Sequence, residues 1–146
     1  MSPGEFDGAV VRRHLLALDQ ALETLRMHQR RPLEALRADR EERWIVERGL
    51  ELCAQNVLDI ATHIAASAGR DVPDYASSID QLAALGVLPA EFAQRLRPLA
   101  GFRNVIVHGY LDIDLEIVHR LLNERLDDLA EFAGRVNRYL EDRTRQ

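Results

Sequence analysis

The sequence predicts an all-α fold, an up-and-down helical bundle of about five helices. Four long segments repeat apolar side chains at alternating steps of three and four residues, which is the period of a helix with one buried face. No segment sustains the apolar–polar alternation of a β-strand. The connections between segments are short, which favours antiparallel neighbours. With 146 residues, 47% of them hydrophobic, we expect a single domain spanning residues 1–146.

The first half of the chain contains two long predicted helices and a short one. The first long helix carries its apolar stripe at Val11, Leu15, Leu18, Leu22 and Leu25. The second carries it at Val46, Leu50, Cys53, Val57, Ile60 and Ile64. The short helix is predicted over about 79–85. Ser78 and Gln81 would form its capping box, and Gly86 would end it.

The second half contains two more long helices. One begins near Pro89, a residue suited to a first helical turn, and its stripe is Phe92, Leu96, Leu99, Phe102 and Ile106. The last has its stripe at Leu115, Val118, Leu122, Leu129 and Val136, interrupted by Arg125. Asp112 or Asp114 could cap this last helix.

Composition excludes several classes of protein. No apolar run approaches the ~20 residues of a membrane span, and the first residues do not form a secretory signal. Cys53 is the only cysteine, so we expect a core residue in a cytoplasmic protein without disulfides. A net charge of −5 argues against indiscriminate nucleic-acid binding but leaves room for a local site. No metal-ligand pattern is present, and we expect neither metal nor cofactor.

Residues 26–48 are dense in charge and contain seven arginines. A solvated face laced with i,i+4 ion pairs is the simplest interpretation. A strip that docks a partner or faces RNA is the alternative. Trp44 within it is expected to anchor a helix–helix or dimer contact rather than to stack on a base. The histidines outside the motif described next are expected to be surface or satisfied core residues: His14, His28, His63 and His119.

The most informative stretch is 101–110, which reads Gly-Phe-Arg-Asn-Val-Ile-Val-His-Gly-Tyr. Its spacing is Arg103, four residues, His108, one residue, Tyr110. On a helical wheel a second, polar face carries Arg97, Gly101, Asn104 and His108 beside the apolar stripe. Glycine in a helix is unfavourable relative to alanine, and is better tolerated where something must approach the backbone closely.

Arg103 and His108 are five residues apart, which places them about 140° apart on an ideal helix. They would converge if the helix ends near His108, where Gly109 could form a left-handed cap. They would also converge if the site combines two chains.

These groups suit cleavage of an RNA phosphodiester. A neutral imidazole at His108 can take the proton of the ribose 2′-OH, and the Arg103 guanidinium can stabilise the charge that develops on the phosphoryl oxygens. No metal is required, and the product would carry a 2′,3′-cyclic phosphate. Arg97 is a candidate for an auxiliary phosphate contact. The spacing alone is a weak signal, because an arginine and a histidine near a helix end are usually cap and surface residues.

The Arg-x4-His-x-Tyr motif, the 42–48 entry to the second helix and the 78–110 segment resemble the HepT-type toxins of the HEPN superfamily. The resemblance implies a homodimer in which Arg103, Asn104 and His108 of both subunits line one cleft. It implies a growth-arresting ribonuclease whose partner is a minimal nucleotidyltransferase (MNT) antitoxin. It also implies that this antitoxin transfers AMP to Tyr110, although a packing tyrosine is the alternative for that residue.

Two other functions remain open at this point. One is a non-catalytic HEPN subunit that binds nucleotide or serves as a scaffold for the nucleotidyltransferase, which the negative charge favours. The other is a helical oligomerisation domain without chemistry. The acidic residues that follow the motif would repel an RNA backbone unless they point away from it: Asp112, Asp114 and Glu116.

Overall fold

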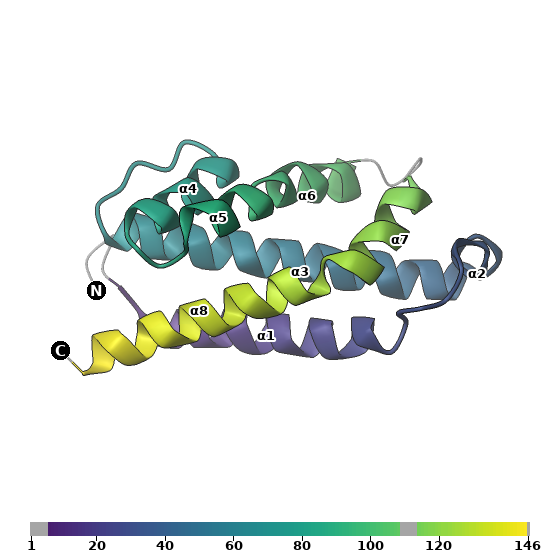
Figure 1. Cartoon of the computed structure of the whole chain (residues 1–146), viewed down its shortest axis with the longest axis horizontal. Helices are drawn as coiled ribbons and strands as arrows, with labels where there is room; N and C mark the ends of the chain where they lie inside the picture. The colour runs from purple at the N-terminus through teal and green to yellow at the C-terminus, as the bar shows by residue number, and fades with distance from the viewer. Residues whose placement is uncertain (1–5, 109–113, 146) are drawn as a thin grey trace.

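The computed structural model describes residues 6–108 and 114–145, and for 104–108 it describes the helical backbone only. This part of the chain forms eight helices and contains no strand. They are α1 (Gly8–Arg26), α2 (Leu33–Ala38), α3 (Arg40–Ser67), α4 (Tyr75–Ala84), α5 (Ala90–Leu96), α6 (Pro98–His108), α7 (Leu115–Glu124) and α8 (Leu126–Thr144). The predicted all-α bundle is confirmed (Figure 1).

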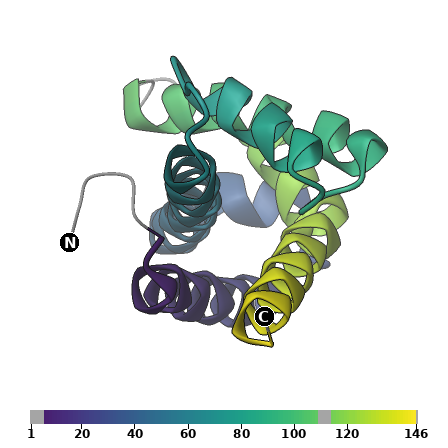
Figure 2. The ribbon, with the colours of Figure 1, turned by 90° about the vertical axis from the view of Figure 1, so that its left-hand side faces the viewer.

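The long helix α3 is the centre of the bundle. It packs against α1 on one side and against α4 and α6 on another, and it also contacts α2, α7 and α8. In the end-on view α1, α3, α8 and the α4–α6 layer surround a common interior (Figure 2). The side chains of the predicted stripes fill this interior, with Leu18, Leu25, Val57, Ile60 and Ile64 all fully or almost fully buried. Burial of these apolar surfaces is the main stabilising contribution to the fold.

The chain enters α1 and leaves α8 at the same end of the bundle (Figure 1). An aromatic cluster joins the two ends there. The Phe6 ring meets the Tyr139 ring edge-on, with centroids 6.0 Å apart, and the Arg143 guanidinium lies 4.2 Å from the centre of the Phe6 ring. The Asp7 backbone N–H donates to Nε2 of His63 on α3 (3.0 Å).

Two of the predicted long helices are divided. The helix predicted from Phe92 to Ile106 forms α5 and α6, because Pro98 has no N–H to continue the hydrogen-bond ladder. The helix predicted from Leu115 to Val136 is divided at Arg125, whose backbone departs from helical geometry (φ −117°, ψ −2°). The short α2 was not among the predicted helices.

The predicted boundaries have mixed outcomes. The Ser78–Gln81 capping box is wrong, because the helix begins a turn earlier and Ser78 is buried inside it. Asp74 accepts from the backbone N–H of Ser77 instead, and Ser77 completes the box. Gly86 does end α4 with a left-handed backbone (φ 80°).

Two further boundary predictions concern proline and aspartate. Pro89 immediately precedes α5, as its N-cap. Asp114 caps α7 by accepting from the backbone N–H of Glu116. Asp112 lies outside the described residues.

Cys53 is fully buried in the core, as predicted. Burial raises the pKa of its thiol to about 12, so it does not supply a thiolate near neutral pH. Within residues 6–108 and 114–145, no helix is long and apolar enough to cross a membrane.

Candidate active site on the motif helix

Arg103 lies in the middle of α6 and reaches across to α3. Its Nε–H donates to Oε1 of Gln55 (2.8 Å). The amide nitrogen of Gln55 donates in turn to Oδ1 of Asp59, one helical turn further along α3 (2.7 Å). Because Asp59 only accepts, it fixes which end of the Gln55 amide faces Arg103. A chain of three side chains therefore sets the position of the guanidinium.

Tyr75, the first residue of α4, supplies the second contact. The Arg103 guanidinium carbon lies 5.3 Å from the centre of the Tyr75 ring, within the range of a cation–π interaction. Arg103 is half-buried in this position. Both contacts are with uncharged groups, and no carboxylate of the described residues forms an ion pair with it. Its positive charge is thus held in place without being neutralised locally, as a binding site for a phosphate requires.

Asn104 and His108 lie further along α6, which is described as far as His108. Their side chains are not among the described ones, and Tyr110 and Gly109 lie outside the described residues altogether. The convergence of the Arg103, Asn104 and His108 side chains therefore remains a prediction. Five residues of α-helix separate Arg103 from His108 by about 7.5 Å along the axis.

Arg97, the auxiliary phosphate candidate, is engaged elsewhere. Its Nε–H lies 3.0 and 3.1 Å from the two carboxylate oxygens of Asp80 on α4. This pair is exposed to solvent, so it is weak, but it does place a negative charge beside the guanidinium. A phosphate-binding role for Arg97 remains a prediction, and it would require Asp80 to release it.

The residues around Arg103 were not found from the sequence. The sequence pattern gave no reason to single out Tyr75, Gln55 or Asp59. The only local signal is that two polar residues at an i,i+4 spacing lie next to the apolar stripe of α3. The contact with Arg103, however, spans 48 positions of the chain, which a single sequence does not reveal.

A hollow of about 280 Å³ lies on another side of α6. Its wall is almost entirely apolar and includes Leu99 and Phe102 of α6 and Ile117 of α7. The two charged residues at this hollow, Arg125 and Asp128, are paired with each other (2.8 Å). This hollow could bury an apolar group, but the residues that line it provide no reactive side chain.

The histidines outside the motif are all partnered, as predicted. His14 lies 2.8 Å from the side-chain oxygen of Asn56, and His119 lies 2.8 Å from the backbone carbonyl of Arg31. His28 lies 3.2 Å from Glu42, and His63 accepts the Asp7 backbone N–H. In the part of the chain that the structure describes, no three His, Cys, Asp or Glu side chains are placed to hold a metal ion.

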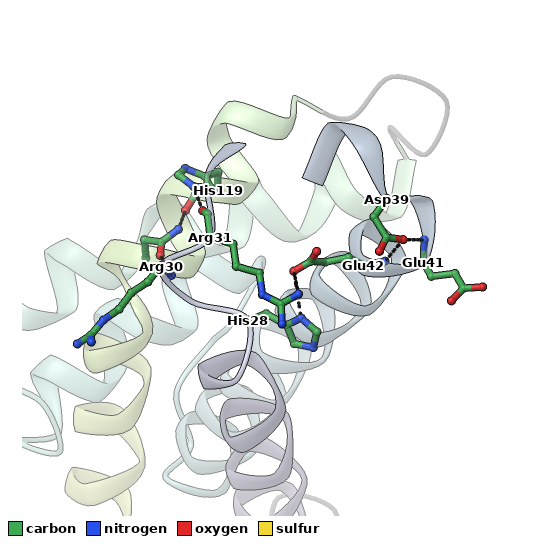
Figure 3. A network of polar contacts seen from close by, with 8 residues as sticks. His28, Arg30, Arg31, Asp39, Glu41, Glu42 and His119 are labelled. Carbon is green, nitrogen blue, oxygen red and sulfur yellow. Dashed lines mark hydrogen bonds and ion pairs between the residues drawn. The ribbon is translucent and has the colours of Figure 1, made fainter. Parts of the chain in front are cut away.

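The charge-dense 26–48 segment is organised around a buried carboxylate (Figure 3). The Glu42 side chain, 7% exposed, accepts from Arg31 (2.7 Å) and lies beside His28. Asp39 caps α3 by accepting from the N–H groups of Glu41 and Glu42. Ion pairs do run through the segment, but none of them has the predicted i,i+4 spacing, and Glu42 is buried instead of lying on a solvated face.

Trp44 on the first turns of α3 is 61% exposed and lies under the Arg40 guanidinium at 5.3 Å. It does not anchor a contact between helices of this chain, so that part of the prediction is wrong. A helical side chain anchors a contact within the chain only if it lies on the face that packs into the core. Trp44 lies outside the apolar stripe of α3 that begins at Val46. A dimer contact at Trp44 stays a prediction.

Comparison with known proteins supplies the relatives of this chain. It is 27% identical over 133 residues, 90% of each chain, to the tRNA nuclease HepT of Aphanizomenon flos-aquae. It is 29% identical over 84 residues to the mRNA nuclease HepT of Shewanella oneidensis, covering 57% of this chain and 63% of that protein. The fold matches the tri-AMPylated HEPN toxin of Shewanella oneidensis, solved in complex with its MNT antitoxin, with a TM-score of 0.76 at 19% identity, over 90% of this chain and 98% of the other. The model of the family described as ribonuclease HepT-like matches residues 18–136, and the chain therefore belongs to that family.

Proposed function

We propose that this protein is a metal-independent ribonuclease and the toxin of a HEPN/MNT toxin–antitoxin pair. The observation that carries the proposal is Arg103, a half-buried guanidinium on the motif helix that is held by Gln55 and Tyr75, both uncharged. Only its Nε–H is used in this contact, which leaves its two terminal amino groups to bind a phosphate in the bidentate manner that arginine favours.

The reaction follows from the two motif side chains and the RNA. His108 accepts the proton of a ribose 2′-OH, and the 2′ oxygen attacks the adjacent phosphorus. The bond from phosphorus to the 5′ oxygen breaks, that oxygen takes a proton from an imidazolium, and a 2′,3′-cyclic phosphate remains. Arg103 stabilises the charge on the phosphoryl oxygens during this step, and Asn104 is proposed to orient the same phosphate. In a homodimer both copies of these residues would line one cleft. The angle of about 140° between Arg103 and His108 on one helix would then no longer keep an arginine and a histidine from meeting at the same phosphate.

The relatives support both the substrate and the partner. Two of them are nucleases of RNA, one of tRNA and one of mRNA, so RNA is proposed here without a choice between the two. The matching HEPN toxin is bound to an MNT antitoxin and carries AMP groups. We therefore propose an MNT-type nucleotidyltransferase as partner and Tyr110 as the acceptor of AMP. A bulky anion two residues from His108 would repel the RNA phosphate and block the cleft.

The test of the nuclease is cleavage of single-stranded RNA in EDTA by the wild type, His108→Ala and His119→Ala. We expect the wild type and His119→Ala to leave 2′,3′-cyclic phosphate ends and to arrest growth, and His108→Ala to do neither. His119 is a matched control because it lies outside the motif and its ring hydrogen-bonds the Arg31 backbone carbonyl. Undiminished cleavage by a folded, dimeric His108→Ala protein would overturn the assignment.

The test of the off-switch is the intact mass of the protein after incubation with the neighbouring nucleotidyltransferase and ATP. We expect gains of one or more AMP units, lost in Tyr110→Phe and kept in Tyr139→Phe. Blocked cleavage with no added mass would mean that the antitoxin acts by binding alone, and Tyr110 would then be a packing residue.

The alternative is a non-catalytic HEPN subunit that binds nucleotide or serves as scaffold for the nucleotidyltransferase. The net charge of −5 favours it, since a nuclease must attract a polyanion. This alternative predicts a stable complex with the nucleotidyltransferase. It also predicts that the wild type and His108→Ala both leave RNA uncleaved.

A further inference from the structure

Trp44 is the largest apolar side chain that the described residues leave exposed to solvent. It is also the only tryptophan of the chain. The Arg40 guanidinium carbon lies 5.3 Å from the centre of its ring, and no carboxylate of the described residues forms an ion pair with Arg40. An exposed aromatic ring with an arginine against it is a common arrangement in sites that bind the bases of single-stranded nucleic acid.

Trp44 lies on the same face of α3 as Gln55, the residue that holds Arg103. The two are eleven residues apart, which corresponds to three helical turns and about 20°. Arg48 lies between them, seven residues before Gln55 and about 20° from it in the other direction. Both Trp44 and Arg48 are exposed, so no helix in the described part of the chain covers them.

The exposed ring lies in the direction in which α6 runs. The helices α3 and α6 pack together in opposite directions, so that α6 advances from Arg103 to His108 towards the end of α3 that carries Trp44 (Figure 1). Along these axes His108 is about 7.5 Å from Arg103, and Trp44 is about 16.5 Å from Gln55. Because Arg103 and Gln55 are in contact, Trp44 lies about 9 Å further along than His108. An RNA strand that follows this direction from Arg103 reaches Trp44 within a few nucleotides.

The charges around Trp44 nearly cancel. Glu51 pairs with Arg48 (3.2 Å), and the exposed Glu41 is the neighbour of Arg40 in the chain. The attraction for a phosphate is therefore weaker here than at Arg103. Stacking on an aromatic ring does not require a net charge, because every base has a π-face. The expected ligand of Trp44 is thus a base and not a phosphate.

We propose that Trp44 stacks on a base of the RNA strand, a few nucleotides from the phosphate held by Arg103 and on the His108 side of it. The proposal rests on the proposed ribonuclease function. Arg40 lies over one face of the indole ring, and the base stacks on the other. Such stacking tolerates any sequence, so the contact increases affinity for longer strands without selecting a base. The alternative is a contact between two subunits, which would bury the ring that the base needs.

The first experiment measures the fluorescence of Trp44, which is specific because the chain has no other tryptophan. The full-length wild type is titrated with a single-stranded RNA whose 2′-OH groups are all methylated, so that it has no nucleophile for cleavage. Anisotropy of a dye on the same strand measures binding. We expect saturable quenching of Trp44 by this strand, and binding without quenching by a strand of equal length that lacks bases. Binding without quenching by the first strand, or equal quenching by both, would overturn the stacking.

The second experiment compares the kinetics of Trp44→Ala and the wild type on a long single strand and on a dinucleotide. We expect Trp44→Ala to raise KM for the long strand about tenfold at unchanged kcat, which is the usual effect of losing one stacked base. The dinucleotide is too short to reach Trp44, so its KM should not change. Trp44→Phe retains a ring and should recover most of the affinity. Leu16→Ala removes a similarly exposed apolar side chain from α1 and should cleave both substrates normally.

The alternative of a subunit contact has a different signature. Analytical ultracentrifugation of Trp44→Ala would then show dissociation of the dimer, and cleavage of the long strand and of the dinucleotide would fall together. That result would overturn the proposal.

Failure of the nuclease is distinguished from failure of the stacking. Quenching without any cleavage by the wild type would leave the base contact standing and remove the ribonuclease. Cleavage without quenching would do the reverse, and a protein that binds no RNA would overturn both.

Discussion

Arg31 and Arg103 are both positioned by a residue of α3, but by partners of different charge. Arg31 binds the buried carboxylate of Glu42 (2.7 Å), beside His28 (Figure 3). Arg103 binds the neutral amide of Gln55 (2.8 Å) and lies over the Tyr75 ring. The charge of Arg31 is therefore compensated by its partner. The contacts of Arg103 orient its guanidinium but do not compensate its charge.

We propose that this difference separates structural from functional arginines in a chain whose 19 basic residues are all arginine. A carboxylate partner cancels the charge that an anionic ligand would need, and where the pair is buried the loss of one member destabilises the fold. A neutral partner contributes less to stability but leaves the charge available. Arg97, held by Asp80, belongs with Arg31 in this respect.

The sharpest test compares Arg103→Met with Arg31→Met. We expect Arg103→Met to lower kcat for RNA cleavage by about 10²–10³-fold, the usual effect of losing one transition-state donor. Arg31→Met should cleave normally when folded and lower the free energy of unfolding by about 1–2 kcal/mol, since Arg31 is half exposed. Steady-state kinetics and urea denaturation measure the two. A fully active Arg103→Met protein would remove the distinction between the arginines.

Glu42→Gln tests the structural side of the comparison. It removes the charge that Arg31 and His28 share but keeps the shape of the side chain. We expect the free energy of unfolding to fall by about 1–2 kcal/mol, because two polar groups lose a buried, charged acceptor. Glu51→Gln is the control, since its pair with Arg48 is more exposed and its loss should change stability by less than about 0.5 kcal/mol. Equal stability losses in the two variants would mean that burial of Glu42 has no effect.

A double substitution can give Arg103 the kind of partner that Arg31 has. Gln55→Glu with Asp59→Asn moves the carboxylate one helical turn towards Arg103, at constant net charge and with the hydrogen-bond chain retained. We expect kcat/KM for RNA to fall about tenfold, because the guanidinium is neutralised, while the protein keeps its stability. Asp59→Asn alone should change kcat/KM by less than about twofold, because asparagine still accepts from Gln55. Unaltered kinetics in the double variant would show that compensation of the charge is irrelevant.

The smallest expected effect concerns two helical glycines, Gly101 on α6 and Gly134 on α8. A Cβ added at either position meets no atom of the described residues within 4 Å. Alanine should therefore stabilise each helix by about 0.5–1 kcal/mol, measured by thermal denaturation. If RNA or a second subunit approaches the motif face, only Gly101→Ala will also lose cleavage activity. Full activity in Gly101→Ala would mean that nothing approaches its backbone.

Much of the fold was predictable because it depends on local periodicity. The stripes led by Val11 and Val46 are buried as expected, since apolar spacing determines which face of a helix packs inwards. The breaks at Pro98 and Arg125 were not predicted, although proline is a known local cause of a break. The N-cap of α4 is Asp74, one turn before the predicted Ser78, because Asp74 and Ser77 together form the capping box.

The candidate site was predictable only in part. Arg103 was predicted as a site residue from its spacing to His108, whereas its contacts with Gln55 and Tyr75, which lie far away along the chain, were not predicted. Such contacts depend on how α3, α4 and α6 pack, which no local pattern encodes. The roles of Asn104, His108 and Tyr110 remain predictions.

The cluster of Phe6, Tyr139 and Arg143 has a mechanical consequence. Since α1 begins where α8 ends and the two helices pack against each other, a force that separates the two ends of the chain acts on one end of the bundle. It would open the contact between α1 and α8 one turn at a time, as a zipper opens, instead of shearing all turns at once. The aromatic cluster is the first contact to bear that load. A machine that pulls this protein apart by its ends would therefore meet this cluster before it reaches the buried core.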